Sequence, residues 1–262
     1  MNVVERSMNG TGLSIVVAAT YLFLYIPIVV LVIFSFNTVP FPGPWKGFTT
    51  EWYTELYYAA ALWKAFYNSL IVAVSATVLS SALSLGLIYY HTMSRRFNRL
   101  FLLLHGNVIV PEIVLAAGLL SLFAFLAVPL GLQTLIVGHT VLGLGYTVPL
   151  MYARFLGIDK RMTEASLDLG ATYSQTFWRV IFPLLLPAIS AAGLLVFIIS
   201  FDDFILSFFC AGSEAQTLSL YIFSIIRSGA SPVVNALSTF LLVLSSLLVI
   251  IFCSLNNKTK IF

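Results

Sequence analysis

The chain contains apolar runs that are too long and too poor in charge for the core of a water-soluble protein. The first, Leu13–Phe36, extends over 24 residues without a charged side chain. A helix of about 20 apolar residues can cross a bilayer, whereas a signal peptide has a shorter apolar core and a small-residue cleavage site. We therefore expect this run to remain as a spanning helix. Of the 262 residues, 60% are hydrophobic and 9% are charged, which indicates a membrane protein.

Six such runs follow one another, and we expect each to form a transmembrane helix. They lie at about residues 13–36, 65–90, 100–127, 134–153, 180–209 and 233–255. The predicted fold is an all-α integral membrane protein with six transmembrane helices. We find no second domain, long repeat or low-complexity tract, so residues 1–262 are predicted to form a single transmembrane domain.

Basic residues are distributed unevenly between the segments that connect these runs. Ten lie on one predicted side: Arg6, Arg95, Arg96, Arg99, Arg154, Lys160, Arg161, Arg179, Lys258 and Lys260. Lys46, Lys64 and Arg227 lie on the other. Because cytoplasmic loops carry the excess of Lys and Arg, both termini are predicted to be cytoplasmic. The Pro-, Gly- and aromatic-rich segment 37–53 is then outside, where we expect an ordered loop at the membrane interface.

Motifs for catalysis, metal binding or nucleic-acid binding are absent from the sequence. It contains no GxxxxGK[ST] loop, HExxH helix, CxxC pair, GxSxG turn or long basic run. We expect no catalytic residue, and no ATP hydrolysis by this chain alone. His91, His105 and His139 lack a carboxylate or cysteine at ligand spacing, so they predict isolated polar or core histidines rather than a metal site. Cys210 and Cys253, expected near opposite membrane faces, predict no disulfide.

The segment at about residues 154–179, between the fourth and fifth runs, is polar and predicted to be cytoplasmic. Lys160–Leu169 contains helix-forming residues, and Gly170 follows where a left-handed C-terminal cap would lie. The stretch Thr172–Gln175 is typical of a capping box, so a second helix should begin at once. The segment keeps five apolar side chains: Leu167, Leu169, Tyr173, Phe177 and Trp178. Either a partner groove or the membrane interface should cover them.

This segment resembles the EAA loop of bacterial ABC-importer permeases. In that pattern Glu-Ala-Ala, three residues, Gly, nine residues and Ile-x-Leu-Pro form the helix that enters a cleft of the ATPase. Four residues keep the pattern at its spacing: Glu164, Ala165, Gly170 and Pro183. Ser166, Val180 and Phe182 replace the second Ala, the Ile and the Leu. The resemblance implies an ATPase-coupling role for Glu164, Ala165, Ser166, Asp168, Gly170 and Pro183.

Five further stretches are similar to the second permease subunit of spermidine/putrescine importers. They are YLFLYIPIVVLVIFSFN, GFTTEWY, VPEIVLAAGLLSLF, ISFDDFILSFF and SGASPVVNALSTFLLVLS. The resemblance implies a type I ABC-importer permease fold in a bacterial inner membrane. It implies a heterodimer with a homologous sister permease, two cytoplasmic ATPase subunits that hold ATP and Mg, and a periplasmic polyamine-binding protein. This chain itself is then expected to hold no cofactor.

Three carboxyl groups lie within the apolar runs, where a central charge costs roughly 2.5 to 3.5 kcal/mol. They are Glu112, Asp202 and Asp203. On an unbroken helix Ser200, Asp203 and Ser207 share one stripe, whereas Asp202 is turned about 100 degrees away. We therefore predict that Asp203 lines a polar substrate path, and that Asp202 pairs across a subunit contact or lines the path from its edge.

Glu112 follows Pro111, where a break in the third run would let freed backbone groups face a cavity. The alternative for all three acidic residues is a protonated or hydrogen-bonded carboxyl group in the packing. Carboxylates in a path favour a cation, and aromatic residues, 15% of the chain, suit cation–π contacts with amines. Phe223 and Arg227 are expected near the outer mouth, either as an outer gate or as anchors at the membrane surface.

The sequence thus predicts the permease subunit of an ATP-driven polyamine importer, which forms half of the translocation path. The alternative is a secondary transporter of a cationic solute, in which Glu112, Asp202 and Asp203 relay protons. A docked ATPase would distinguish the first from the second, which needs only an ion gradient. An intramembrane enzyme is disfavoured because no nucleophile–base or metal constellation is present.

Overall fold

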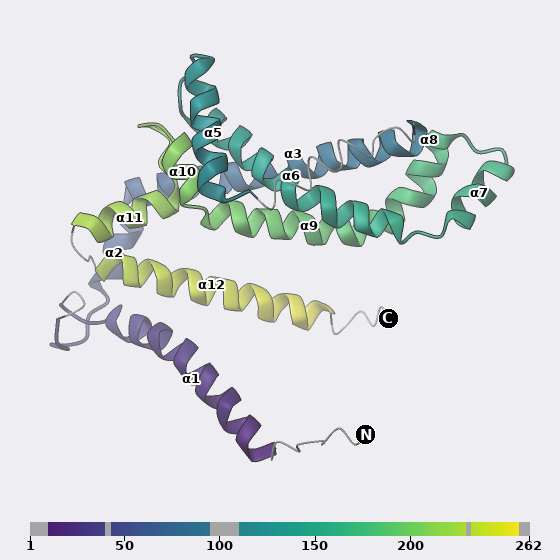
Figure 1. Ribbon diagram of the computed structural model, residues 1–262. Helices are drawn as coiled ribbons and strands as arrows, with labels where there is room; N and C mark the ends of the chain where they lie inside the picture. Colours follow the sequence, from purple (N-terminus) through teal and green to yellow (C-terminus); the bar gives the residue numbers. More distant parts are fainter. Residues whose placement is uncertain (1–9, 40–42, 95–109, 229–231, 257–262) are drawn as a thin grey trace, which may run out of the picture. The chain divides into compact units, whose positions relative to one another are not determined.

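The computed structural model describes residues 10–39, 43–94, 110–228 and 232–256. Within these ranges the backbone is mostly helical, as Figure 1 shows. The rest consists of turns, connecting segments and one isolated bridge between Asn37 and Phe48. The predicted all-α class is confirmed for this part of the chain.

Four helices in the described ranges are long and apolar enough to cross a membrane: Gly12–Phe34, Ala60–Met93, Leu132–Leu156 and Tyr173–Asp202. They overlap the first, second, fourth and fifth predicted spans. The predicted span 100–127 is described only from residue 110 onward. Outside the described residues lie Arg6, Arg95, Arg96, Arg99, His105, Lys258 and Lys260, and the side chain of Cys253 is not described either. The six spans and the cytoplasmic termini stay predictions.

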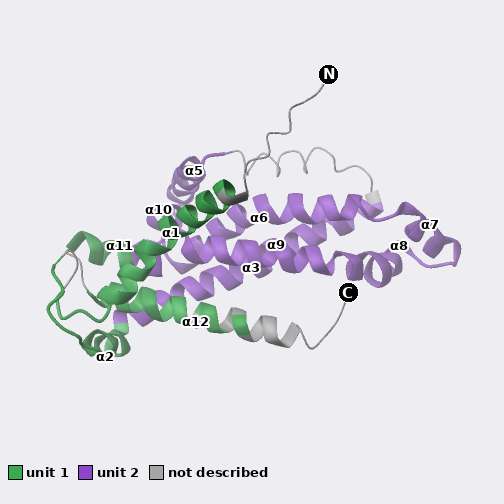
Figure 2. Cartoon of the chain, turned by 90° about the horizontal axis from the view of Figure 1, so that it is seen from below, with its two compact units in different colours: residues 1–60, 222–262 green, residues 61–221 purple. Residues whose placement is uncertain are grey.

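The chain forms two compact units, residues 1–60 with 222–262 and residues 61–221, which Figure 2 colours separately. The first unit contains α1 (Gly10–Phe34), α2 (Glu51–Tyr58) and α12 (Pro232–Asn256), and α12 packs against α1 and α2. Helix α11 (Leu218–Ser228) has residues in both units. The prediction of a single permease domain stays a prediction.

The predicted outer segment 37–53 is ordered around one asparagine wherever it is described. The Asn37 amide nitrogen donates to the carbonyl oxygens of Val39 and Pro44 at 2.9 and 3.1 Å. Its side-chain oxygen accepts from the Lys46 backbone nitrogen at 3.0 Å, and the Trp52 indole donates to the Asn37 carbonyl at 2.7 Å. These bonds satisfy backbone groups that a turn leaves open. Membrane anchoring by this segment stays a prediction.

The second unit contains the remaining helices, listed in chain order. They are α3 (Ala60–Ser94), α5 (Glu112–Phe125), α6 (Leu132–Leu156), α7 (Lys160–Asp168), α8 (Tyr173–Thr176), the π-helical turn η1 (Phe177–Ile181), α9 (Phe182–Asp202) and α10 (Ile205–Cys210). Helix α6 packs along α9, and α10 packs against α5 and α6. Figure 1 shows α6 and α9 side by side.

Small residues on α6 allow its neighbours to approach closely. A Cβ atom at Gly143 would lie 2.9 Å from both Ser80 Oγ and Val196 Cγ1, on α3 and α9. The Thr147 and Ser84 hydroxyl groups form a buried hydrogen bond of 2.6 Å between α6 and α3. Close approach and interhelical hydrogen bonds of this kind stabilise helix packing where lipid removes the usual hydrophobic driving force.

The prediction of an unbroken helix through residues 180–209 is wrong near its end. Helix α9 stops at Asp202, Asp203 has an extended backbone (φ −63°, ψ 130°), and α10 begins at Ile205. The physical reason is the Asp203 side chain, which accepts hydrogen bonds from the backbone nitrogens of Leu206 and Ser207 at 3.3 and 2.8 Å. A carboxyl group that satisfies the first open N–H groups of a helix favours a new helix start.

Candidate functional site

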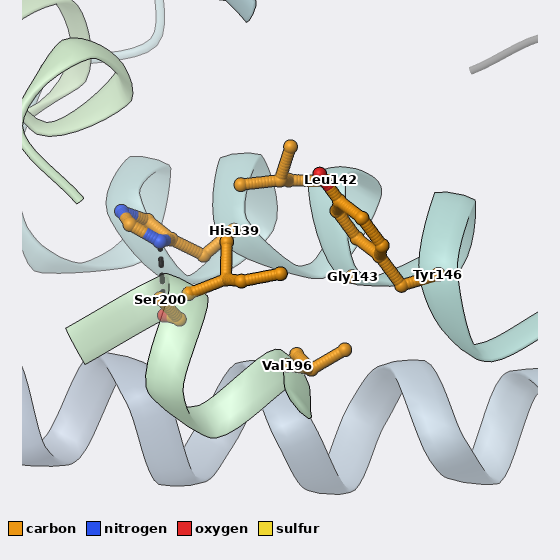
Figure 3. A pocket seen from close by; sticks show the side chains of 7 residues that line it. His139, Leu142, Gly143, Tyr146, Val196 and Ser200 are labelled. Carbon is orange, nitrogen blue, oxygen red and sulfur yellow. Dashed lines mark hydrogen bonds between the residues drawn. The ribbon is translucent and has the colours of Figure 1, made fainter. Parts of the chain in front are cut away.

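A buried polar cluster lies where α6 meets the break between α9 and α10. Its centre is His139 on α6, whose side chain is completely buried. His139 Nδ1 lies 2.9 Å from Ser200 Oγ, in the last turns of α9, and Figure 3 shows this pair. His139 Nε2 lies 3.4 Å from Ser207 Oγ on α10 and 3.6 Å from Asp203 Oδ2. The three residues predicted to share one stripe, Ser200, Asp203 and Ser207, thus gather around one imidazole, although the helix between them is broken.

Asp203 accepts hydrogen bonds through both its carboxyl group and its backbone carbonyl group. Its carboxyl group is 2% exposed and accepts the two backbone N–H groups of α10. Its carbonyl oxygen accepts from the Ser219 hydroxyl at 2.5 Å. A buried carboxylate is tolerated only when donors surround it. This environment therefore accounts for a carboxyl group inside an apolar bundle.

Glu112 joins the same cluster from a third element. It is the first residue of α5, directly after Pro111. Residues 95–109 lie outside the described ranges, so the predicted break at this proline stays a prediction. Its half-buried side chain lies within hydrogen-bonding reach of that of Asp203. Two of the three predicted path carboxyl groups are thus brought together.

Asp202 is the predicted path residue that lies outside this cluster. It ends α9, and its side chain is exposed, whereas that of the next residue, Asp203, is buried. The prediction that Asp202 is turned away from Ser200, Asp203 and Ser207 agrees with these positions, although the helix is broken at Asp203. The roles of Asp202, Asp203 and Glu112 in a substrate path stay predictions.

A small hollow adjoins the cluster between α6 and α9, as Figure 3 shows. It is lined by His139, Leu142, Gly143, Tyr146, Val196, Ile199 and Ser200. The hollow is mostly apolar and too narrow for a water molecule. It therefore offers no preformed chamber for a polar solute.

Of the predicted alternatives, an isolated polar or a core histidine, His139 is a core histidine, because its side chain is completely buried. The hydrogen-bond partners of His139 lie 61 and 68 positions away in sequence. The one local signal was a histidine beside the small residue Gly138 within an apolar run. His91 packs edge-on against the rings of Tyr152 and Phe155. In the described ranges no three His, Cys, Asp or Glu side chains are arranged to hold a metal ion.

The second candidate site is the corner between α7 and α8, which has the predicted local structure. Gly170 has a positive φ of 83°. The Gly170 nitrogen donates to the Leu167 carbonyl at 2.9 Å, and the Ala171 nitrogen donates to the Ser166 carbonyl at 3.1 Å. These two bonds form a Schellman motif, which ends α7.

The second helix begins immediately after this cap, as predicted. The Thr172 nitrogen donates to Gln175 Oε1 at 2.9 Å, and the Gln175 nitrogen donates to Thr172 Oγ1 at 3.3 Å. This reciprocal pair is a capping box. Ser166 Oγ and Thr176 Oγ1 lie 3.0 Å apart and join α7 to α8. The corner is therefore held by hydrogen bonds on both sides of Gly170.

The apolar side chains of the corner divide into covered and exposed ones. The expectation that Phe177 needs a partner is wrong, because it is fully buried and packs edge-on against Tyr89, 4.9 Å between ring centroids. Leu167 is half-buried. Leu169, Tyr173 and Trp178 are 89%, 56% and 52% exposed. These three keep an apolar surface on the corner.

The other residues implied in coupling lie on or near this corner. Glu164, Ala165 and Asp168 are exposed on α7, and Pro183 is exposed in the first turn of α9. Ser166, by contrast, is half-buried and bonded to Thr176. It therefore has a structural contact of its own.

The predicted outer-gate residues lie together on α11. Phe223 and Arg227 are both exposed. They are four residues apart, so they share one face of this helix. Whether they form a gate or an anchor stays open.

Known proteins resemble this chain in sequence and in fold. No family model matches it. It is 40% identical over 238 residues to the spermidine/putrescine transport system permease protein PotC of Escherichia coli, covering 88% of this chain and 89% of that protein. PotC of Haemophilus influenzae is 36% identical over 246 residues, covering 92% and 94%. The putrescine transport system permease protein PotI of Escherichia coli is 33% identical over 233 residues, covering 85% and 82%.

A solved structure supports the fold. The chain superposes with a TM-score of 0.71 on a chain of a bacterial ABC transporter involved in the import of the acidic polysaccharide alginate. The match covers 99% of this chain and 100% of that one at 17% sequence identity. At this identity the match concerns the fold alone.

Proposed function

Because this chain belongs to the family of spermidine/putrescine transport system permeases, we propose that it serves an ATP-driven polyamine importer as one of two permease subunits. The full-length similarity to PotC is the observation that carries this proposal. The importer is placed in a bacterial inner membrane, and the chain crosses that membrane six times with both termini in the cytoplasm. This arrangement is of the type I ABC-importer class.

The corner at Gly170 is the proposed contact with a cytoplasmic ATPase. Its exposed apolar residues, Leu169 and Tyr173, suit a groove on a partner, and the two capping motifs hold them in a fixed relation. Glu164, Ala165 and Asp168 contribute the polar surface of α7. One of two ATPase subunits binds here, and ATP and Mg are held by the ATPase rather than by this chain.

The translocation path is proposed to lie between this chain and a homologous sister permease. The hollow beside His139 is too narrow for a solute, which supports a path at a shared surface. Asp202, exposed at the end of α9, is the carboxylate best placed to meet a cation there or to pair across the subunit contact. Asp203 and Glu112 support the path from within the bundle. A periplasmic binding protein delivers the polyamine, and Phe223 and Arg227 gate the outer mouth or anchor it in lipid.

The test is uptake of radiolabelled spermidine and putrescine by bacteria that lack their own polyamine importers. The chain is expressed with the ATPase, sister permease and binding protein encoded beside it. We expect uptake that needs all four proteins and stops when the ATPase carries a hydrolysis-blocking substitution. A protonophore should have little direct effect while cellular ATP is maintained. Uptake that persists without the ATPase and is abolished by the protonophore would refute the proposal in favour of the ion-gradient-driven transporter.

A further inference from the structure

We infer that His139 is a positioning residue for transport: its imidazole holds α9 and α10 in register across their break and so fixes the Asp202–Asp203 pair. The inference rests on the proposed transport function. It gives a role in transport to a residue on α6 whose sequence pattern predicts only a packed or isolated polar side chain. The residue acts through the carboxyl groups, because its own side chain is completely buried.

Backbone hydrogen bonds alone do not fix the angle between α9 and α10. Asp203 is extended, so the helical hydrogen-bond ladder is interrupted between the end of α9 and the first residue of α10. The interruption leaves the angle between the two helices to side chains and packing. The segment around such a break moves unless polar contacts hold it.

His139 provides contacts on both sides of this break from a single ring. Nδ1 reaches Ser200, which precedes the break, at 2.9 Å. Nε2 reaches Ser207, which follows it, at 3.4 Å, and Asp203, which lies within it, at 3.6 Å. Because α6 is continuous through this region, the ring connects the C-terminal end of α9 and the N-terminal end of α10 to one unbroken helix.

The chemistry of the partners assigns the two ring nitrogens. The Asp203 carboxyl group already accepts two backbone N–H groups, so it is an acceptor toward Nε2 as well. Nε2 therefore carries the hydrogen, and Nδ1 accepts the hydrogen of the Ser200 hydroxyl group. A neutral imidazole satisfies this arrangement. The tautomer is set by the partners, as in other buried histidines.

This assignment predicts graded effects of substitution at residue 139. The amide of asparagine reaches roughly as far as Nδ1, and that of glutamine roughly as far as Nε2, so each retains contact on one side of the break only. Leucine fills the space and retains neither contact. Thr140 offers a matched control, because it is buried on the same helix and, within the described part of the chain, its hydroxyl donates to the Ile136 carbonyl of α6 at 2.7 Å.

The experiment uses the whole importer purified in lipid and reconstituted into vesicles. Four variants are compared with wild type: His139→Leu, His139→Gln, His139→Asn and Thr140→Val. Subunit stoichiometry reports assembly, and the number of polyamine molecules imported per ATP hydrolysed reports positioning. A purely structural defect lowers the amount of assembled complex without changing this ratio.

We expect His139→Leu to assemble and hydrolyse ATP while importing about tenfold less polyamine per ATP, the effect of about one buried hydrogen bond. His139→Gln and His139→Asn should lie between leucine and wild type, and Thr140→Val should match wild type. A wild-type ratio in His139→Leu overturns the inference. If His139→Leu fails to assemble, the test passes to His139→Gln. The inference is overturned if His139→Gln also fails to assemble, or if it imports as much polyamine per ATP as wild type. A wild-type complex that imports no polyamine refutes the proposed function instead.

Discussion

Replacing Gly170 with valine should weaken ATPase binding while the protein still inserts into the membrane. Gly170 is the only residue of the α7–α8 corner with a positive φ, 83°. A Cβ atom added there would meet no other atom within 4 Å. The penalty therefore comes from the backbone conformation and not from a clash.

The size of this penalty follows from the left-handed conformation. An L-residue pays roughly 1 to 2 kcal/mol there, and a β-branched residue is among the least tolerant. Since 1.4 kcal/mol is about a factor of ten in an equilibrium constant, we expect the equilibrium constant for forming the native corner to fall roughly five- to thirtyfold. Loss of this turn releases the bonds from Gly170 and Ala171 and reorients α7. The transmembrane helices do not depend on it.

The assay measures membrane abundance by immunoblot, ATPase co-purification and polyamine uptake on the same samples. Gly170→Asn is the matched control, because asparagine adopts the left-handed region more readily than other L-residues. The expected order in both ATPase binding and uptake is wild type, then asparagine, then valine, at equal abundance. If valine and asparagine behave like wild type, the corner geometry is not required for coupling.

Three further experiments test the remaining proposals. Glu164→Lys, on the exposed face of α7, should reduce ATPase co-purification at normal membrane abundance, and full recruitment would contradict a contact at this face. Glu112→Gln keeps a donor toward Asp203, so it should retain most of the uptake. Asp203→Asn loses an acceptor for the α10 backbone, worth about 1.5 to 3 kcal/mol, and should lose most of the uptake. Uptake is measured at matched membrane abundance, and the reverse order would contradict the proposed role of Asp203 in the cluster. A cysteine at Gly43 should react with an impermeant reagent added outside, and one within residues 95–99 should not. Labelling in the opposite pattern would contradict the predicted topology, with both termini in the cytoplasm.

The corner at Gly170 was predictable from the sequence because its signals are local. A left-handed cap and a capping box depend on residues within one or two turns of each other, and Thr172 with Gln175 fulfils this condition. Only the covering of Phe177 was missed, because Tyr89 lies on a different helix. Residue spacing does not reveal that kind of contact.

The cluster at His139 could not be predicted in the same way. Apolar helices present similar surfaces on all sides, so periodicity does not select which helix faces which. The break at Asp203 was missed because the apolar run continues through it. An aspartate four positions before Ser207 was the available sign, since that spacing allows a side chain to cap the next helix.

The two adjacent aspartates therefore have different requirements in a membrane. Asp203 is approached by two backbone N–H groups, the imidazole and Glu112, so its burial is compensated within the chain. Asp202 has an exposed side chain and depends on what lies outside this chain. A carboxylate that faced only lipid would be costly. Under the proposed function, water, a sister subunit or a cationic substrate must meet Asp202, and the capped, histidine-held break at Asp203 keeps it at that surface.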